Sequence, residues 1–218
     1  MSDHNEIVTN IEFFNKSDEY FMSSSIDKTV KIWKNFECVH TFKDHEDWIR
    51  CIGISKSNKY FLSGCVSSIV KGWDLETKKV MFTLSNKSSD SNFLNTVNSL
   101  NYLNYNDNIF ICALRDGSIK IFDTRAKEML QTSFKAHKIK LNSVKINNND
   151  TYYLSSGRDN SIRLWDSRKI PVSIIIYWFI FRRMMILKLI LIIALRSIKV
   201  INVLVTILRL TSLIMKIM

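Results

Sequence analysis

The stretch FMSSSIDKTVKIWK (residues 21–34) decides the fold, because the chain returns to the same phrase three more times. In each copy a Ser-rich or apolar strand leads through a turn to a basic and apolar strand that ends in an aromatic residue. The later copies read FLSGCVSSIVKGWD (61–74), ICALRDGSIKIFD (111–123) and LSSGRDNSIRLWD (154–166). Their closing aromatics, Trp33, Trp73, Phe122 and Trp165, are 40, 49 and 43 residues apart. A period of this size predicts a repeat architecture.

Each unit contains four short apolar runs separated by turn residues. In the second unit they read IRCIGIS (49–55), YFLSGC (60–65), IVKGWD (69–74) and VMFTLS (80–85). Short runs that are rich in β-branched and aromatic residues predict strands, and no helical periodicity competes with them in residues 1–166. The sequence therefore predicts an all-β chain whose units are small four-stranded antiparallel sheets. A single sheet of this kind cannot bury both of its faces, so neighbouring sheets are expected to stack.

Polar residues recur at fixed distances before each closing aromatic. Six residues before it stand Asp27, Ser67, Asp116 and Asp159, and ten residues before it stand Ser23, Ser63, Cys112 and Ser155. At 28 or 29 residues before it stand His4, His45 and His137, with no histidine in the third unit.

This pattern resembles the WD-repeat β-propeller family over residues 4 to about 171. The resemblance implies a partial propeller within residues 1–171, with four units at about 4–42, 43–85, 92–134 and 135–177. In that family the His, Ser or Thr, Asp and Trp of one unit form a buried hydrogen-bonded tetrad. The structural tetrad residues implied here are His4, Ser23, Asp27, Trp33, His45, Ser63, Trp73, Asp116, His137, Ser155, Asp159 and Trp165.

The same residue types also make a hydrolase triad, and the repetition decides between the two interpretations. An active site occurs once, whereas this set recurs across units. We therefore expect these side chains to be buried and hydrogen-bonded, holding the strands of a blade together and joining neighbouring blades. With the tetrads set aside no catalytic set remains, so we expect no enzyme, no cofactor and no metal site.

Composition and charge favour an intracellular protein. Net charge is +11, but the last 47 residues contain seven basic and no acidic residues, so residues 1–171 carry only +4. Nucleic-acid binding is therefore not expected from charge. Cys38, Cys51, Cys65 and Cys112 lack metal-binding spacing and fit reduced, buried thiols. The polar, acidic start MSDHNEIVTN is unlike a secretory signal, and a cytoplasmic or nuclear location is expected.

The composition changes past Pro171. Residues 172–218 form an atypical hydrophobic and basic tail, rich in Ile, Leu and Met and without Gly, Asp or Glu. Lys and Arg interrupt every apolar run, which disfavours a simple membrane span, since each costs about 2.5–3.5 kcal/mol in mid-bilayer. Three interpretations stay open: a gene-model artefact, a membrane-associated segment and packed structure. We favour the first, because AAT codons for Asn become ATA codons for Ile when an AT-rich gene is read one base on. The run VSIIIY (172–177) fits the fourth strand of unit four.

Closure of the ring is a separate question. WD-repeat propellers usually have about seven units, and four are recognisable here. We expect an open arc, a ring completed by another chain, or a shortened form of a longer propeller. An unclosed array exposes sheet faces and edges that promote association.

Loops at the ends of the blades are expected to carry any binding site. The segments with the His column and the turns between second and third strands are expected on one face, with Ile26, Trp48, Arg115 and Arg158. Trp and Arg are enriched at binding hot spots. The expected partner is an acidic or phosphorylated peptide, because Arg binds such groups through two parallel hydrogen bonds.

A second motif lies in the fourth unit. LSSGRDNSIRLWDSR (154–168) resembles the box by which some WD-repeat proteins bind the adaptor of cullin-4 ubiquitin ligases. The matching positions are Asp159, Ile162, Trp165, Asp166 and Arg168, and FDTR (122–125) is a partial copy that ends in Arg125. We therefore expect a non-enzymatic protein-interaction scaffold, with a cullin-4 substrate receptor and a membrane-tethered adaptor as alternatives.

Overall fold

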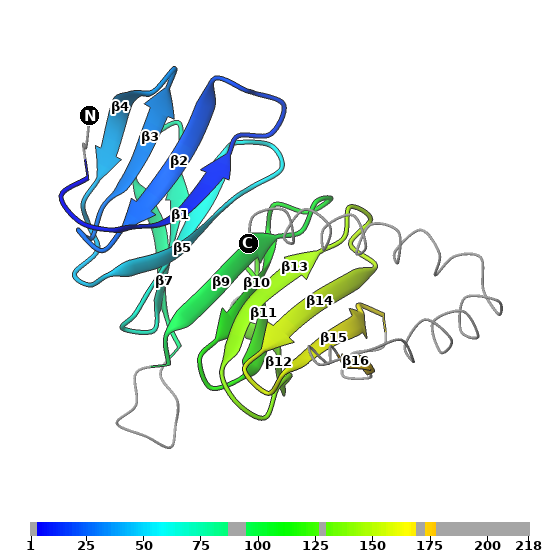
Figure 1. Cartoon of the computed structure of the whole chain (residues 1–218). Helices are drawn as coiled ribbons and strands as arrows, with labels where there is room; N and C mark the ends of the chain where they lie inside the picture. Colours follow the sequence, from blue (N-terminus) through cyan, green and yellow to red (C-terminus); the bar gives the residue numbers. More distant parts are fainter. Residues whose placement is uncertain (1–3, 87–94, 127–129, 169–172, 178–218) are drawn as a thin grey trace, which may run out of the picture. The chain divides into compact units, whose positions relative to one another are not determined.

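The computed structural model describes residues 4–86, 95–126, 130–168 and 173–177. These residues belong to one compact unit, Met1–Trp178. All their regular structure is β-strand, arranged in four antiparallel four-stranded sheets (Figure 1), which confirms the all-β prediction and the four-unit propeller. Among the described residues no helix, and therefore no helical membrane span, is found. The rest of the tail, with the alternatives raised for it, lies outside the described residues.

We call the sheets blades 1 to 4 in chain order, and each pairs its strands in sequence order. Blade 1 contains β1 (Val8–Phe13), β2 (Tyr20–Ser25), β3 (Val30–Lys34) and β4 (Glu37–Phe42); blade 2 contains β5 (Ile49–Ile54), β6 (Tyr60–Cys65), β7 (Ile69–Asp74) and β8 (Val80–Ser85). Blade 3 contains β9 (Val97–Tyr102), β10 (Ile109–Leu114), β11 (Ser118–Asp123) and β12 (Leu130–Lys135); blade 4 contains β13 (Leu141–Ile146), β14 (Tyr152–Gly157), β15 (Ser161–Asp166) and β16 (Ser173–Tyr177). Strand β16 pairs with β15, as the run VSIIIY predicts.

The turn between the second and third strands has the same backbone shape in every blade. Lys28, Ser68, Gly117 and Asn160 hold equivalent positions and all have positive φ, at 67°, 70°, 91° and 57°. Glycine is required only in blade 3, where an added Cβ would collide with the carbonyl oxygens of His137 and Ile139.

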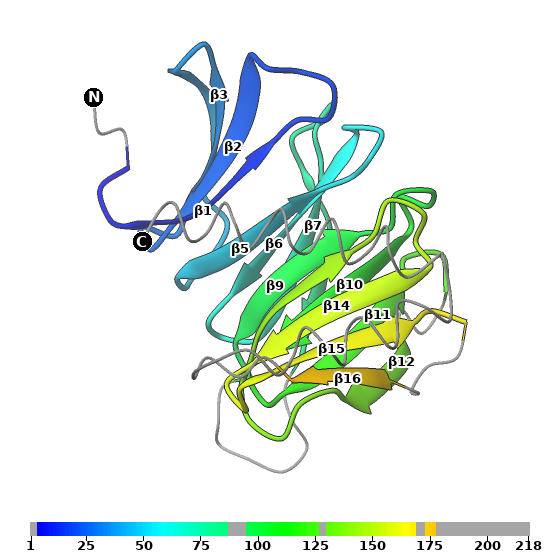
Figure 2. The same ribbon diagram turned by 45° about the vertical axis from the view of Figure 1, so that its right-hand side comes forward.

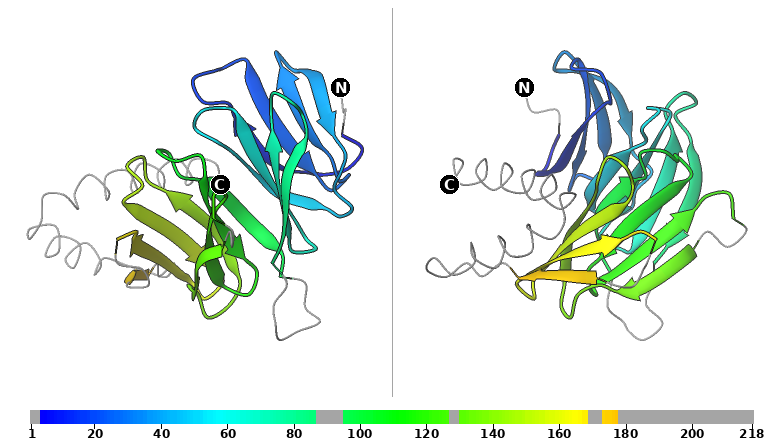
Figure 3. Two further views of the ribbon diagram at one scale, coloured as in Figure 1. Left: turned by 180° about the vertical axis from the view of Figure 1, so that it is seen from behind. Right: turned by 90° about the vertical axis from the view of Figure 1, so that its right-hand side faces the viewer.

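The cores lie between neighbouring blades. Blades 2 and 3 each contribute one face to the core shared with the blade before and the opposite face to the core shared with the blade after, whereas blades 1 and 4 each contribute to one core. Between blades 1 and 2, Met22 and Val30 pack with Ile52, Phe61 and Trp73, and all five are buried. Figures 2 and 3 show β5 and β9, the first strands of adjacent blades, side by side. Stacking therefore buries what an isolated sheet would leave exposed.

A serine hydroxyl joins the second and third strands in three blades. In blade 4 the Ser155 Oγ accepts a hydrogen bond from Trp165 Nε1 at 2.9 Å and lies 2.8 Å from His137 Nε2. The other ring nitrogen, Nδ1, lies 2.8 Å from an Asp159 carboxylate oxygen. Because the ionised Asp159 carboxylate can only accept, His137 donates to it from Nδ1–H, and the Ser155 hydroxyl donates to the remaining ring nitrogen, Nε2.

Blade 1 repeats this arrangement. His4 lies 2.6 Å from Ser23 Oγ and 2.8 Å from Asp27, and Trp33 donates to Ser23 at 2.7 Å. Burial opposes ionisation of Asp27, but the hydrogen bonds that it accepts from Thr29, His4 and backbone amides lower its pKa to about 2. Asp159 is likewise buried, and hydrogen bonds from Ser161, His137 and the backbone lower its pKa to about 2.

Blades 2 and 3 depart from it in different ways. In blade 2 Ser63 still bonds His45 at 2.5 Å and Trp73 at 2.8 Å, but Ser67 stands in place of the aspartate. Burial, with Lys71 nearby, lowers the pKa of His45 to about 4. In the described part of blade 3 no tetrad forms: Cys112 and Phe122 are buried in an apolar core, and the Asp116 carboxylate accepts hydrogen bonds from Ser118 in its own turn.

The expectation that the tetrads join blades is wrong, because every tetrad bond lies within one blade. Side chains near the start and end of the first strand make the bonds between blades. Two such bonds join blade 1 to blade 2: Thr9 Oγ1 donates to Ile49 O at 2.7 Å, and Asn15 Nδ2 donates to Ser55 O at 2.9 Å. The equivalent bonds join blade 3 to blade 4: Asn98 Nδ2 donates to Leu141 O at 2.6 Å, and Asn104 Nδ2 donates to Asn147 O at 3.0 Å.

Replacement of a tetrad serine is expected to destabilise the protein more than replacement of its apolar counterpart. Ser155→Ala leaves the His137 and Trp165 nitrogens buried without their partner, at a cost of about 2 to 4 kcal/mol. Cys112→Ala, at the same position of blade 3, removes a thiol from an apolar core and should cost about 1 kcal/mol. Urea unfolding followed by tryptophan fluorescence measures both, and equal losses would contradict the role assigned to Ser155.

The stability of blade 2 is expected to depend on pH through His45. The pKa of His45 falls from the ordinary histidine value of 6.5, which applies to the unfolded chain, to about 4 in the folded blade. Between these values the unfolded chain binds a proton that the folded chain does not, so the free energy of unfolding falls as pH decreases. The loss between pH 7 and pH 5 should be about 2 kcal/mol from this group. Asp27 and Asp159 act in a lower window, from pH 3.8 down to about 2.

Ser67→Asp provides the matched variant. It places a carboxylate where Asp27 and Asp159 lie 2.8 Å from their histidines, and so should raise the pKa of His45. Urea unfolding at pH 7 and pH 5 should show a smaller acid-induced loss in the variant than in the parent. If the variant and the parent lose the same free energy of unfolding between pH 7 and pH 5, this role of His45 is contradicted.

Candidate basic concavity at the ends of blades 2 to 4

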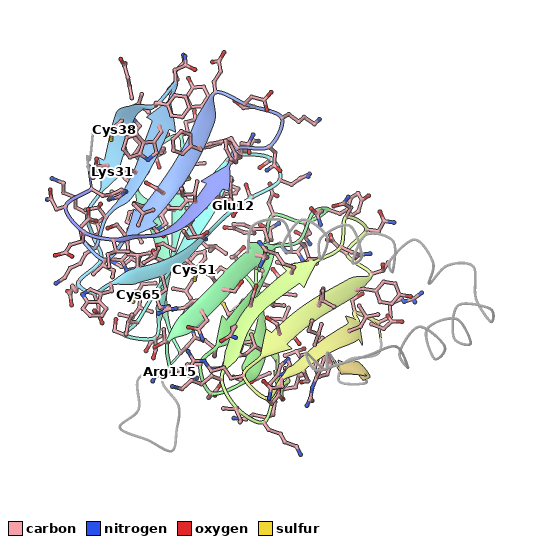
Figure 4. All side chains as sticks on the ribbon, in the orientation of Figure 1. Glu12, Lys31, Cys38, Cys51, Cys65 and Arg115 are labelled. Atoms are coloured by element: carbon pink, nitrogen blue, oxygen red, sulfur yellow. The ribbon has the colours of Figure 1, made fainter. Side chains whose placement is uncertain are left out.

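One concavity of about 450 Å³ gathers the residues expected on a binding face. We call it the basic concavity, and its lining is Trp48, Arg50, Val66, Thr96, Asn98, Arg115, Lys140, Asn142 and Arg158. Trp48, Arg115 and Arg158 were predicted for this face. Ile26, the fourth predicted residue, is half-buried in blade 1 and does not line it. Figure 4 shows Arg115 at the end of the strands.

The repeat positions the lining by two devices. Backbone hydrogen bonds fasten the second strand's end to the segment before the first strand: Val66 N to Trp48 O, Arg115 N to Thr96 O and Arg158 N to Lys140 O, at 2.8–3.0 Å. In addition, each first strand has a bulge at its start, located at Arg50, Asn98 and Asn142. A bulge redirects one side chain out of the regular alternation.

The charges of the lining are unbalanced. Three arginines of the described chain are neutralised by aspartates: Arg125 by Asp123 at 2.6 Å, Arg163 by Asp159 at 3.3 Å and Arg168 by Asp166 at 2.9 Å. The other three arginines in the described ranges, Arg50, Arg115 and Arg158, all line the basic concavity. No ion pair joins them or Lys140 to a described acidic residue, and no acidic residue lines the concavity.

Trp48 adds an apolar surface to this positive site. Its side chain is 51% exposed, whereas Trp73 and Trp165 are 1% and 3% exposed. Trp48 is therefore not a core residue, and its exposure is a property of the binding-face position rather than of tryptophan in this fold. An exposed aromatic beside unpaired guanidinium groups is suited to a ligand with both apolar and anionic parts.

The tetrad serines and the buried cysteines are not available for chemistry. The Oγ atoms of Ser23, Ser63 and Ser155 are buried and already bonded to a histidine and a tryptophan, so no substrate reaches them as nucleophiles. Burial raises the pKa of the Cys51 and Cys112 thiols, which keeps them protonated and unreactive. Among the residues with described positions, no group of three metal-binding side chains gathers.

None of the residues that resemble the cullin-4 box lines this concavity. Asp159 and Trp165 belong to the blade 4 tetrad, and Ile162 is half-buried. Arg168 donates from Nε and Nη2 to the two carboxylate oxygens of Asp166, at 3.0 and 2.9 Å.

Arg125 binds Asp123 in the same two-bond geometry in blade 3. The guanidinium group of Arg125 lowers the pKa of Asp123 through these hydrogen bonds. Both arginines stay exposed, with side-chain exposures of 59% for Arg125 and 68% for Arg168.

Sequence reasoning missed Arg50, Lys140, Asn98 and Asn142 in the basic concavity. Their signal is visible only when the units are aligned at the starts of their first strands, rather than at the closing aromatics. In that alignment Trp48, Thr96 and Lys140 share one position, and Arg50, Asn98 and Asn142 share the next but one.

Comparison with known proteins agrees with this architecture. Residues 35–177 match the protein family described as "Nucleolar protein 10-like, N-terminal domain", a β-propeller. Residues 1–34 match the "WD domain, G-beta repeat".

Three curated relatives are similar over parts of the chain. Pre-mRNA-processing factor 17 of Saccharomyces cerevisiae is 27% identical over 128 residues, which cover 57% of this chain and 27% of the relative. Pre-mRNA-processing factor 19 of Oryza sativa subsp. japonica is 34% identical over 64 residues (27% and 12%). The ribosome biogenesis protein WDR12 homolog of Anopheles gambiae is 32% identical over 68 residues (28% and 16%).

The matched region thus spans well under a third of each relative's length. The family match, in contrast, covers more than half of this chain and includes three of its four blades. The chain belongs to the WD-repeat β-propellers, in the family of nucleolar protein 10-like N-terminal domains.

Proposed function

We propose that the chain is a non-enzymatic interaction scaffold in a nuclear complex that processes RNA, and that its basic concavity binds an acidic or phosphorylated segment of a partner protein. The names of the relatives support the setting, since they refer to pre-mRNA processing and ribosome biogenesis. The observation that carries the binding role is that, of the arginines in the described ranges, the three without an aspartate partner all line one concavity.

The chemistry of the lining favours an anionic peptide. Arginine binds carboxylates and phosphates through parallel N–H donors, and each charge-assisted hydrogen bond contributes about 1.5–3 kcal/mol. Trp48 offers apolar contact at low entropic cost, which suits a side chain next to the anionic group. The exposed amide group of Asn142 can accept from or donate to a peptide backbone, whereas the Asn98 amide N–H already bonds Leu141 O.

A nucleic-acid ligand is less favoured by the same residues. The described blades are nearly neutral overall, because Asp and Glu balance most of their Lys and Arg. Binding to a phosphate backbone needs an extended basic surface and is strongly weakened by salt. A compact site with a few cations and one aromatic fits a short peptide better.

Charge reversal inside the concavity is expected to weaken peptide binding. The full chain is titrated with a fluorescein-labelled peptide of alternating Asp and Leu, with a phosphoserine peptide and with a single-stranded RNA of equal length, followed by fluorescence anisotropy. Arg115→Glu with Arg158→Glu should lower affinity for the preferred acidic peptide at least tenfold. The matched control is Arg125→Glu with Arg168→Glu, which makes the same charge change at aspartate-paired positions and should have little effect. Equal losses in the two double variants, or binding of RNA alone, would reject the proposal.

A second candidate is a cullin-4 substrate receptor, and one observation favours it. Arg125 and Arg168 are held in the same orientation by Asp123 and Asp166 at the ends of adjacent blades, while both remain exposed. Side chains held in place in this way lose little entropy when they bind a partner.

Recovery of the cullin-4 adaptor tests this candidate. The full chain is used as bait with purified adaptor, and the Arg168→Ala and Arg125→Ala variants are compared with Arg115→Ala. The receptor role predicts that the first two lose adaptor and the third retains it. Absence of adaptor from the parent complex would end this candidate and leave the scaffold proposal intact. The membrane-tethered alternative concerns residues outside the described ranges.

A further inference from the structure

Two sheet faces at the ends of the blade series have the residues of a blade-to-blade joint but are not covered by another of the described blades. We call them the incoming face of blade 1, formed by Val8, Ile11, Phe21 and Trp33, and the outgoing face of blade 4, formed by Leu154, Ile162 and Leu164. The two faces are compared below with the same positions inside the three internal joints.

The incoming face is buried in every blade except the first. Ile11 is 54% exposed, whereas Ile52, Leu100 and Val144 at the same position are 1%, 3% and 0% exposed. Val8 is 44% exposed, whereas Ile49, Val97 and Leu141 are all 0% exposed.

The aromatic pair of this face behaves likewise. Phe21 stacks on Trp33 at 5.8 Å, as Phe61 stacks on Trp73 at 5.4 Å. The pair in blade 1 is only half-buried, whereas the pair in blade 2 is buried by blade 1.

The outgoing face shows the same contrast at the other end. Leu154 occupies the position of Met22, Leu62 and Ile111, which are all 0% exposed. Ile162 corresponds to Val30, Val70 and Ile119, which are also 0% exposed. Leu154, Ile162 and Leu164 are only half-buried in blade 4. These three side chains are apolar like those at the same positions between blades, but they are less buried.

The polar groups of the two faces also match. Asn142 holds the bulge position from which Asn98 donates to Leu141 O at 2.6 Å and Thr9 donates to Ile49 O at 2.7 Å. Its side chain is exposed. The carbonyl group of Val8 stands at the position of those two acceptors. One face therefore presents a donor where the other presents an acceptor.

We propose that a second copy of this chain docks the outgoing face of its blade 4 onto the incoming face of blade 1. The occupant is argued from continuity with the three joints inside the chain, which unite the same two kinds of face by the same columns. This contact joins two different surfaces, so it is heterologous and builds a closed ring or a short head-to-tail array. The contact shares Asn142 with the lining of the basic concavity, but its apolar residues lie outside that lining, and it goes beyond the proposed function.

Complementation between two single-face variants tests the contact. Ile11→Asp blocks the incoming face and Leu164→Asp blocks the outgoing face. Each full-length variant is run alone and as an equimolar mixture by sedimentation velocity across a concentration series. The parent should form dimers or larger species, each variant alone should remain monomeric, and the mixture should form a dimer that grows no further, because only one intact pair of faces remains.

The other outcomes are equally informative. A monomeric parent at all concentrations overturns the proposal, and so does association of either variant alone, which would indicate a symmetric contact or association through another part of the chain. Circular dichroism at each concentration confirms that the variants are folded. Val8→Asp replaces Ile11→Asp, and Leu154→Asp replaces Leu164→Asp, if either loses the β-sheet signal. Peptide binding at the basic concavity should be unchanged in all four variants.

Discussion

A single serine hydroxyl per blade is the hub on which the geometry of blades 1, 2 and 4 depends. It receives the tryptophan N–H from the third strand and bonds the histidine that precedes the first strand. Three separate segments are thereby held at fixed distances without help from the neighbouring sheet. Inside a core of low dielectric such a bond is strong and the penalty for leaving it unmade is large, so the arrangement tolerates few substitutions. Blade 3 avoids that penalty because Cys112 stands in place of the serine and Phe122 in place of the tryptophan, and both are buried in an apolar core.

Stability within a blade and attachment between blades use different residues. The tetrads close each sheet on itself, whereas apolar faces and the side chains of the first strand connect one sheet to the next. This division explains why both ends of the series have surfaces suited to another blade.

The basic concavity follows from this division. Loop segments that enter the first strand and leave the second are fastened to each other by backbone hydrogen bonds, so their side chains need not contribute to folding. In blades 2 to 4 those positions hold tryptophan, arginine and lysine, and the positive charge is left without an internal counter-charge. Elsewhere in the described blades arginines are neutralised by an aspartate two or four residues away. Among the described residues, the arginines that lack an aspartate partner thus all line this one concavity.

Much of this protein was determined by its sequence alone. The period of the closing aromatics predicted four sheets, and the columns that end at Trp33 and Trp165 predicted complete sets of bonded side chains, because such patterns are local and recur at fixed spacing. Tertiary structure alone decided the rest. Asn15, Asn98 and Asn104 bond carbonyl groups of the next blade across 40 to 43 residues of chain, and nothing in the local sequence identifies those partners. Arg50 and Lys140 join Arg115 and Arg158 because bulges and the stacking of blades bring distant loops together. The exposure of Trp48, Ile11 and Leu164 likewise depends on which neighbour covers each face, and no single unit of the sequence contains that information.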